Sequence, residues 1–166
     1  MKRKIIFVFL AIILIALDQW SKFWIVANLK GRDNIVWIKK IFELEYLEND
    51  GAAFSSFSGK QGFLLVLTVI ILLAVIVEFI RTPSDKRYIP METAFILLIS
   101  GAVGNMIDRV RQGYVVDFFY FVPINFPRFN VADCYVTVSA ILLCILILFV
   151  YKEEETAYLF RFKKKQ

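Results

Sequence analysis

The stretch GFLLVLTVIILLAVIVEFI, residues 62–80, decides the fold class, because its single charged residue is Glu78 and the rest is almost entirely apolar. About 20 apolar residues in a helix cross the roughly 30 Å hydrocarbon core of a bilayer. Runs of comparable length occupy residues 5–27, 89–108 and 132–151. The chain is 59% hydrophobic, too apolar to coat a water-soluble globule of 166 residues. The sequence therefore predicts an all-α membrane protein of four transmembrane helices in one domain, 1–166.

Basic residues indicate how the chain is oriented in the membrane. The N-terminus, the connection around residues 81–87 and the tail 152–166 carry clusters of Lys and Arg, whereas the basic residues of 31–59 are interleaved with acidic ones. Because Lys and Arg accumulate on the cytoplasmic side, both termini are expected there. The net charge of +5 points to anionic phospholipid headgroups as contacts, and not to nucleic acid.

The connections on the other side differ in character. Residues 35–38 (IVWI) are β-branched or aromatic, and residues 41–47 (IFELEYL) place acidic residues between apolar ones; Gly and Asn-Asp-Gly turn signals lie around them. They predict a small extracytoplasmic β-rich cradle over residues 31–59. The connection between the third and fourth spans is expected to be a short loop or helix with an extended part at 114–119.

This topology gathers the unusual polar residues at one membrane face. They are Asp18 and Lys22 on the first span, Asn49 and Gly51 in the β-rich segment, Asn105, Asp108 and Arg109 at the end of the third span, Asp117 in the connection, and Asn130 and Asp133 at the start of the fourth span. Ionisable groups beside hydrocarbon are costly, and they persist mainly where they have a function. The sequence therefore predicts a polar site at the extracytoplasmic surface.

The absence of histidine restricts the chemistry of this site. It excludes a Ser-His-Asp triad, a Cys-His pair and a His-based zinc site, and no metal or cofactor is expected. Two carboxylates that share one proton remain, with Asp117 and Asp133 as candidates. Asn130 is expected to cap the fourth helix, whose positive end would favour the ionised form of Asp133. The hypothesis is that Asp133 carries the charge and Asp117 the proton.

Other polar residues are expected to surround and position Asp117 and Asp133. Asp18 and Lys22 are spaced four residues apart, which suits an ion pair on one helix face. Asn105, Asp108 and Arg109 read as a polar scaffold in which Arg109 holds a carboxylate or a lipid phosphate.

Four segments at the span ends combine these polar residues with small and aromatic ones: 18–22 (DQWSK), 49–54 (NDGAAF), 101–109 (GAVGNMIDR) with Gly113, Val116, Asp117 and Phe118, and 129–133 (FNVAD). In order and position, these segments resemble motifs of the bacterial lipoprotein signal peptidase family, the type II signal peptidases. Departures are small: Ser100 stands where a glycine is common, and Cys134 where a small hydroxyl residue is common.

The resemblance implies an aspartyl endopeptidase in the bacterial cytoplasmic membrane, with four transmembrane helices and a β-cradle. Its substrate would be a prolipoprotein already modified with diacylglycerol, cut N-terminal to the lipidated cysteine. Asp117 and Asp133 match the catalytic pair of the family. Asn49, Asn105, Arg109 and Asn130 match polar residues around it, and Asp18 and Lys22 match the motif of the first span. The chain is expected to act as a monomer.

Three alternatives remain open at this stage. In a Ser-Lys protease, Lys22 would activate Ser55, Ser56 or Ser100. In a proton- or cation-coupled transporter, the acidic residues would form a pathway through the membrane. A non-catalytic assembly factor would tolerate replacement of both aspartates.

Overall fold

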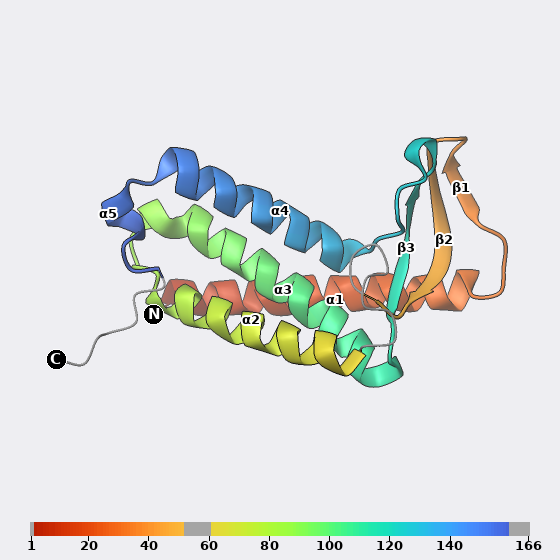
Figure 1. Ribbon diagram of the computed structural model, residues 1–166, viewed down its shortest axis with the longest axis horizontal. Coiled ribbons are helices and arrows are strands. Elements are labelled where there is room, and N and C mark those ends of the chain that lie inside the picture. Colours follow the sequence, from red (N-terminus) through yellow and green to blue (C-terminus); the bar gives the residue numbers. More distant parts are fainter. Residues whose placement is uncertain (1, 52–60, 160–166) are drawn as a thin grey trace.

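Four long helices run side by side, and a small sheet lies at one end of them (Figure 1). The structure is a computed structural model that describes residues 2–51 and 61–159. The long helices are α1 (Lys2–Leu29), α2 (Gln61–Arg81), α3 (Ile89–Gln112) and α4 (Val131–Ile145), the last continued by a π-helical turn, Leu146–Val150. Short helices at Lys86–Tyr88, Val122–Ile124 and α5 (Glu153–Thr156) complete the helical elements of the described chain.

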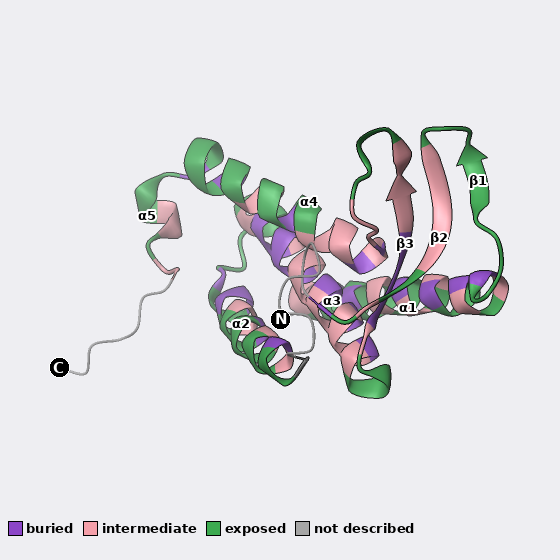
Figure 2. Cartoon of the chain, turned by 45° about the vertical axis from the view of Figure 1, so that its right-hand side comes forward, coloured by how far each residue is buried: buried purple, intermediate pink, exposed green. Residues whose placement is uncertain are grey.

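The four helices are long and apolar enough to cross a membrane, as predicted. The candidate spans are Lys2–Leu29, Gly62–Arg81, Lys86–Gln112 and Val131–Val150, within a few residues of the predicted runs. Large apolar side chains are exposed on their outer faces; Phe23 is 73% exposed and Phe149 is 81% exposed. Figure 2 shows exposed residues along α2 and α4 and buried ones where α1, α3 and α4 meet. Such an apolar exterior suits a hydrocarbon solvent and not water.

α3 contacts α1, α2 and α4, and small residues allow two of these helices to approach it closely. A Cβ atom on Gly104 would lie 2.6 Å from Oδ2 of Asp18 on α1, and one on Gly101 would lie 2.5 Å from the carbonyl oxygen of Ala132 on α4. A larger residue at either position would push these helices apart. Gly101 and Gly104 therefore allow the close packing of α3 against α4 and α1.

Three antiparallel strands form the sheet, in the order β1 (Ile35–Ile38), β2 (Phe42–Asn49) and β3 (Val115–Phe121). The two predicted β-type stretches are confirmed, and the expected extended part at 114–119 becomes β3. Residues 52–60 of the predicted β-rich segment lie outside the described residues. β1 is exposed along its length, as Figure 2 shows.

The sheet is fixed to the helices through one face of β3. Val116 and Phe118 are buried against Ile25 and Leu29 at the end of α1. Because side chains alternate across a strand, Asp117 points to the opposite face, where Leu47 of β2 is its neighbour in register. At the next step both Phe118 and Phe119 donate backbone hydrogen bonds to the carbonyl of Phe129, which ties β3 to the segment that leads into α4.

The described ends of the chain lie at the opposite end of the bundle from the sheet (Figure 1). There Arg3 Nε lies 2.7 Å from Oε2 of the fully buried Glu92. Lys4 Nζ donates to the carbonyl groups of Phe79, Ile80 and Thr82, so it caps the C-terminal end of α2. These contacts fix the start of α1 against the α2–α3 connection.

Candidate active site

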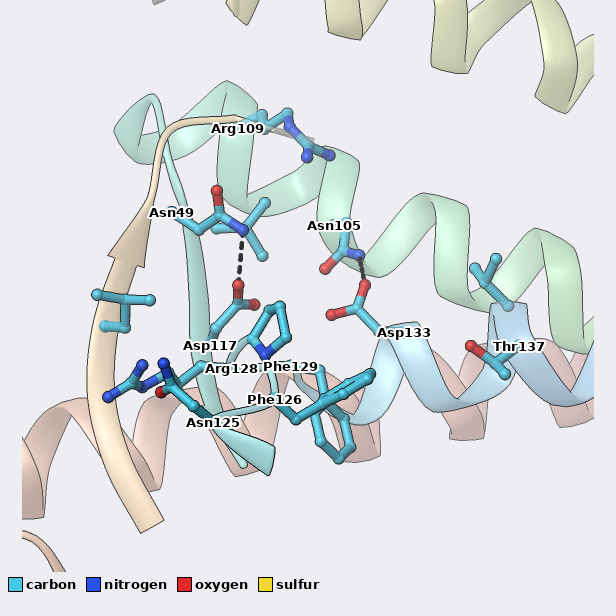
Figure 3. Close-up of a pocket in the computed structure, with 14 residues that line it drawn as sticks. Asn49, Asn105, Arg109, Asp117, Asn125, Phe126, Arg128, Phe129, Asp133 and Thr137 are labelled. Atoms are coloured by element: carbon cyan, nitrogen blue, oxygen red, sulfur yellow. Dashed lines mark hydrogen bonds between the residues drawn. The ribbon is translucent and has the colours of Figure 1, made fainter. Parts of the chain in front are cut away.

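Asp117 of β3 and Asp133 in the first turn of α4 line one cavity of about 620 Å³. Figure 3 shows both carboxyl groups pointing into it from different elements. Asn49, Asn105 and Arg109 line the same cavity. Residues predicted to meet at one membrane face are therefore brought together by β2, β3, α3 and α4.

Asp117 is 1% exposed and is held by two amide groups. Asn49 Nδ2 donates to its Oδ2 at 2.7 Å, and Asn130 Nδ2 donates to its Oδ1 at 2.6 Å. Burial, followed by the charge of Asp133, raises the pKa of Asp117 to about 6, although both amide hydrogen bonds and the charge of Lys22 favour the ionised form. Burial therefore keeps Asp117 protonated to a higher pH than a free aspartic acid.

Asp133 is positioned by the start of α4. Asn130 Oδ1 accepts from the Asp133 backbone N–H at 3.0 Å, and the Asn130 backbone N–H donates to Asp133 Oδ2 at 3.1 Å. This reciprocal pair is a capping box, and it confirms Asn130 as the N-cap. Asn105 Nδ2 holds the other oxygen, Oδ1, at 2.8 Å (Figure 3).

Asn130 links the two aspartates, because its side chain contacts both. Its Oδ1 accepts from the backbone of Asp133 and its Nδ2 donates to Asp117, while Nδ2 also reaches Asn105 Oδ1 at 3.2 Å. Asn130 is fully buried. One residue thus fixes the relative placement of the two carboxyl groups.

A buried ionic cluster lies directly behind these residues. Lys22 Nζ is 3.0 Å from Asp18 Oδ2 and 3.0 Å from Asp108 Oδ2, and it donates to Asn105 Oδ1 at 2.9 Å. The ion pair expected between Asp18 and Lys22 is confirmed, and Asp108 joins it as a second carboxylate.

The two carboxylates of this cluster also hold the backbone of other elements. Asp18 Oδ1 accepts from the Ala132 N–H of α4 at 2.9 Å, and Asp108 Oδ2 accepts from the Val116 N–H of β3 at 3.3 Å. Lys22 therefore neutralises two buried acids that tie α1, α3, α4 and β3 together.

Arg109 contacts the turn after β2, because its Nη2 donates to the Gly51 carbonyl at 3.0 Å. That it holds a carboxylate or a lipid phosphate stays a prediction. Gly51 in turn donates its N–H to Asn49 Oδ1 at 2.9 Å, so the turn after β2 is fastened to the site. The buried Nε of Arg109 has no hydrogen-bond partner among the described residues.

Two features were not singled out from the sequence. Gln19 Nε2 donates to Asp18 Oδ2, Gly104 O and Asp108 Oδ1, at 3.2, 3.1 and 3.0 Å. Its position inside the motif of residues 18–22 was the only available signal. Arg128 lines the cavity and pairs with Glu45, 83 residues away, a pairing that no local pattern indicates.

Of the three serine residues considered for a Ser-Lys pair, the structure describes only Ser100. Ser100 is fully buried, and its hydroxyl donates to the Ile96 carbonyl of its own helix at 2.7 Å. Among the described residues, Lys22 Nζ makes its ion pairs with Asp18 and Asp108 and its hydrogen bond with Asn105, and none with Ser100. Ser55 and Ser56 lie outside the described residues.

Comparison with known proteins places these features in a family. The family model of signal peptidase (SPase) II matches residues 10–149. A lipoprotein signal peptidase of Streptococcus thermophilus (strain CNRZ 1066) is 40% identical over 156 residues, which is 94% of this chain and 99% of that protein. One of Lactococcus lactis subsp. lactis (strain IL1403) is 42% identical over 147 residues, 88% of this chain and 95% of that protein.

A solved bacterial membrane enzyme has the same fold, with a TM-score of 0.75 at 32% identity, covering 96% of this chain and 94% of its own. A second one, also with a TM-score of 0.75, is 36% identical and covers 87% of this chain and 94% of its own. The family match and the relatives extend over nearly the whole chain, including all four helices and the sheet. The chain therefore belongs to the signal peptidase II family.

Proposed function

We propose that this protein is an aspartyl endopeptidase of the membrane that removes the signal peptide from diacylglyceryl-modified prolipoproteins, cutting N-terminal to the lipidated cysteine. The observation that carries the proposal is the pair Asp117 and Asp133, whose carboxyl groups point into one cavity and are connected through Asn130. Two carboxylates with one shared proton suffice for peptide hydrolysis without a metal or a covalent intermediate.

In the first step the ionised Asp133 takes a proton from water, and the water oxygen attacks the scissile carbonyl carbon. Protonated Asp117 gives its proton to the carbonyl oxygen, which yields a neutral diol. The diol then breaks down: Asp133 returns its proton to the amide nitrogen of the lipidated cysteine, Asp117 takes a proton from one hydroxyl, and the C–N bond breaks. The products are a carboxylic acid on the signal peptide and a free amine on the cysteine.

The roles of the two acids follow from their surroundings. Asp133 lies in the first turn of α4, where the helix dipole and the donors on Asn130 and Asn105 stabilise a negative charge. Asp117 lies on β3 without a helix dipole, and burial raises its pKa to about 6. Because both acids are buried and each accepts two hydrogen bonds, the helix dipole at Asp133 is the difference that favours Asp117 as the holder of the shared proton, as hypothesised from the sequence.

The orientation that suits this function has both termini in the cytoplasm and the sheet end outside. Its support is the charge distribution: Lys2, Arg3, Arg87 and Lys152 belong to segments at the end opposite the sheet. A cysteine anchored by diacylglycerol then fixes the scissile bond at interfacial depth, next to the two aspartates. Positioning of this kind lowers the entropic part of the activation barrier.

The test is cleavage of a diacylglyceryl-modified prolipoprotein by the purified protein. Asp117→Asn and Asp133→Asn are each expected to lower kcat by about 10²–10⁴-fold, the usual contribution of an acid or base. Asp33→Asn, at an exposed position before β1, is the matched control and should retain activity. Undiminished turnover by either aspartate variant would contradict the two-aspartate mechanism. If Ser55→Ala or Ser56→Ala lost activity while Asp117→Asn and Asp133→Asn both kept it, the Ser-Lys alternative would be favoured.

A further inference from the structure

The cavity has two chemically different ends. Val136 and Thr137 of α4 line it at the helix end, whereas Arg128 and Asn125 line it at the sheet end. In Figure 3 the two aspartates lie between Thr137 on one side and Arg128 with Asn125 on the other. A polypeptide bound with its scissile bond at the aspartates therefore has Arg128 on the sheet side and the uncharged Val136 and Thr137 on the α4 side. The other basic residue of the lining, Arg109, is bonded to the Gly51 carbonyl.

Arg128 is held in place by residues of two strands. Its Nε and Nη2 donate to Glu45 Oε2 of β2 at 3.1 and 2.8 Å. Its guanidinium lies over the ring of Tyr120 of β3, with 3.9 Å between Cζ and the ring centroid, and Tyr120 donates its hydroxyl to Asn125 Oδ1 at 2.9 Å. A guanidinium fixed by a carboxylate and an aromatic ring is preorganised to bind.

The guanidinium keeps donors for a ligand. An arginine has five N–H donors, and the bonds to Glu45 use only Nε and Nη2. Nη1 finds no acceptor within the described segments 2–51 and 61–159, and the side chain remains 27% exposed at the cavity. Because Glu45 already balances the charge, the open edge suits an oxygen acceptor such as a peptide carbonyl and does not require an anionic ligand.

We propose that Arg128, held by Glu45 and Tyr120, forms a subsite for the polypeptide that immediately follows the lipidated cysteine, and that it binds an oxygen acceptor of that segment. The inference rests on the proposed function. The signal segment is apolar and belongs beside the membrane-spanning α4, near Val136 and Thr137. The chain beyond the cysteine must then leave past the sheet, where Arg128 lies.

Two substrates that differ only after the cysteine test the subsite. One ends at the amide of the lipidated cysteine, and the other continues for about six residues, which span about 20 Å when extended. For the long substrate, Arg128→Ala is expected to raise KM by about tenfold, the value of one hydrogen bond to a charged group, with little change in kcat. For the short substrate its KM should equal that of the wild type.

Two further variants separate binding from sheet stability. Lys30→Ala removes an ion pair, to Glu48, from the same sheet without touching the cavity lining, so both KM values should stay unchanged. Arg128→Lys keeps the charge but loses the planar fork, so the KM for the long substrate should rise by less than in Arg128→Ala.

Three results would overturn the inference. An equal change in KM for both substrates in Arg128→Ala would mean that Arg128 only holds β2 against the segment before α4. No effect on either substrate would remove it from binding altogether. An effect that depends on the length of the segment before the cysteine would assign it to the signal peptide. If the wild type cleaves neither substrate, the proposed function itself fails, a result distinct from these three.

Discussion

Asp117 is almost fully buried, yet its carboxyl group faces a cavity and two amide donors. Burial and the nearby Asp133 oppose ionisation, while Asn49 and Asn130 favour it. The balance leaves the pKa at about 6. A carboxylic acid with such a pKa can hold a proton at mildly acidic to neutral pH and release it during a reaction.

This pKa predicts the pH dependence of cleavage. Because the pKa is raised, Asp117 is protonated below about pH 6 and loses its proton as the pH rises through that value. The proton needed by the scissile carbonyl is then missing, so kcat/KM should fall on the alkaline side. The pH profile of kcat should also fall on the alkaline side, but at a higher pH than that of kcat/KM. The reason is that bound substrate excludes water and further opposes the ionisation of Asp117.

Asn49 provides the control for this assignment. Asn49→Ala removes a hydrogen-bond donor that favours the ionised form of Asp117. In the residual activity of this variant, the alkaline fall of kcat/KM should therefore move to higher pH. A shift to lower pH, or a flat profile between about pH 5 and 8, would assign the proton elsewhere.

At the level of elements, the start of α4 combines helix capping with placement of the site. The carbonyl oxygen of the Asn130 side chain caps the helix, and the amide nitrogen of the same side chain holds Asp117. Asp133 itself lies in the first turn of α4, three residues after Asn130. Stability of this helix and geometry of the two carboxyl groups are therefore coupled through one residue.

Two substitutions separate these roles of Asn130. Asn130→Ser keeps an oxygen that can cap α4 but loses the donor to Asp117, whereas Asn130→Ala loses both. The free energy of unfolding, measured by chemical denaturation in detergent, should be about 1 kcal/mol lower for Asn130→Ala than for Asn130→Ser. Cleavage should fall by at least about tenfold in both variants. Full activity of Asn130→Ser would show that the amide donor to Asp117 is dispensable.

At the scale of the whole molecule, the cluster around Lys22 connects the helices to the sheet. Lys22 and Asp18 lie on α1, Asp108 on α3, and the carboxylates bind the backbone of α4 and β3. All three side chains are nearly inaccessible to solvent. Buried charges of this kind are stable only as a complete set, because one missing partner leaves an uncompensated charge.

Lys22→Met should consequently destabilise the protein by about 3–5 kcal/mol, since it leaves Asp18 and Asp108 buried without a cation. Lys30→Met is the matched control: its pair with Glu48 is 52% and 41% exposed, so its loss should destabilise the protein far less than Lys22→Met. Denaturation of both variants in the same detergent provides the comparison. Equal stability of the two variants would mean that the cluster contributes no more than a surface ion pair.

The sequence by itself determined the four helices, the two strands of the β-rich segment, the extended part at 114–119, the cap at Asn130 and the ion pair between Asp18 and Lys22. These features depend on local properties: the length of an apolar run, the alternation of side chains, and spacings of three or four residues. Gathering the polar residues at one end followed from the same information, because four consecutive spans leave few ways to arrange their ends.

Only the tertiary structure decided which polar groups contact one another. The bond of Arg109 to Gly51, the joint hold of Asn130 on both aspartates and the pairing of Arg128 with Glu45 join residues far apart in the sequence. Such contacts depend on the register of β2 against β3 and on how closely α3 approaches α1 and α4. A shift of one residue in a strand would turn Asp117 away from the cavity, so the geometry of the site is a property of packing and not of local pattern.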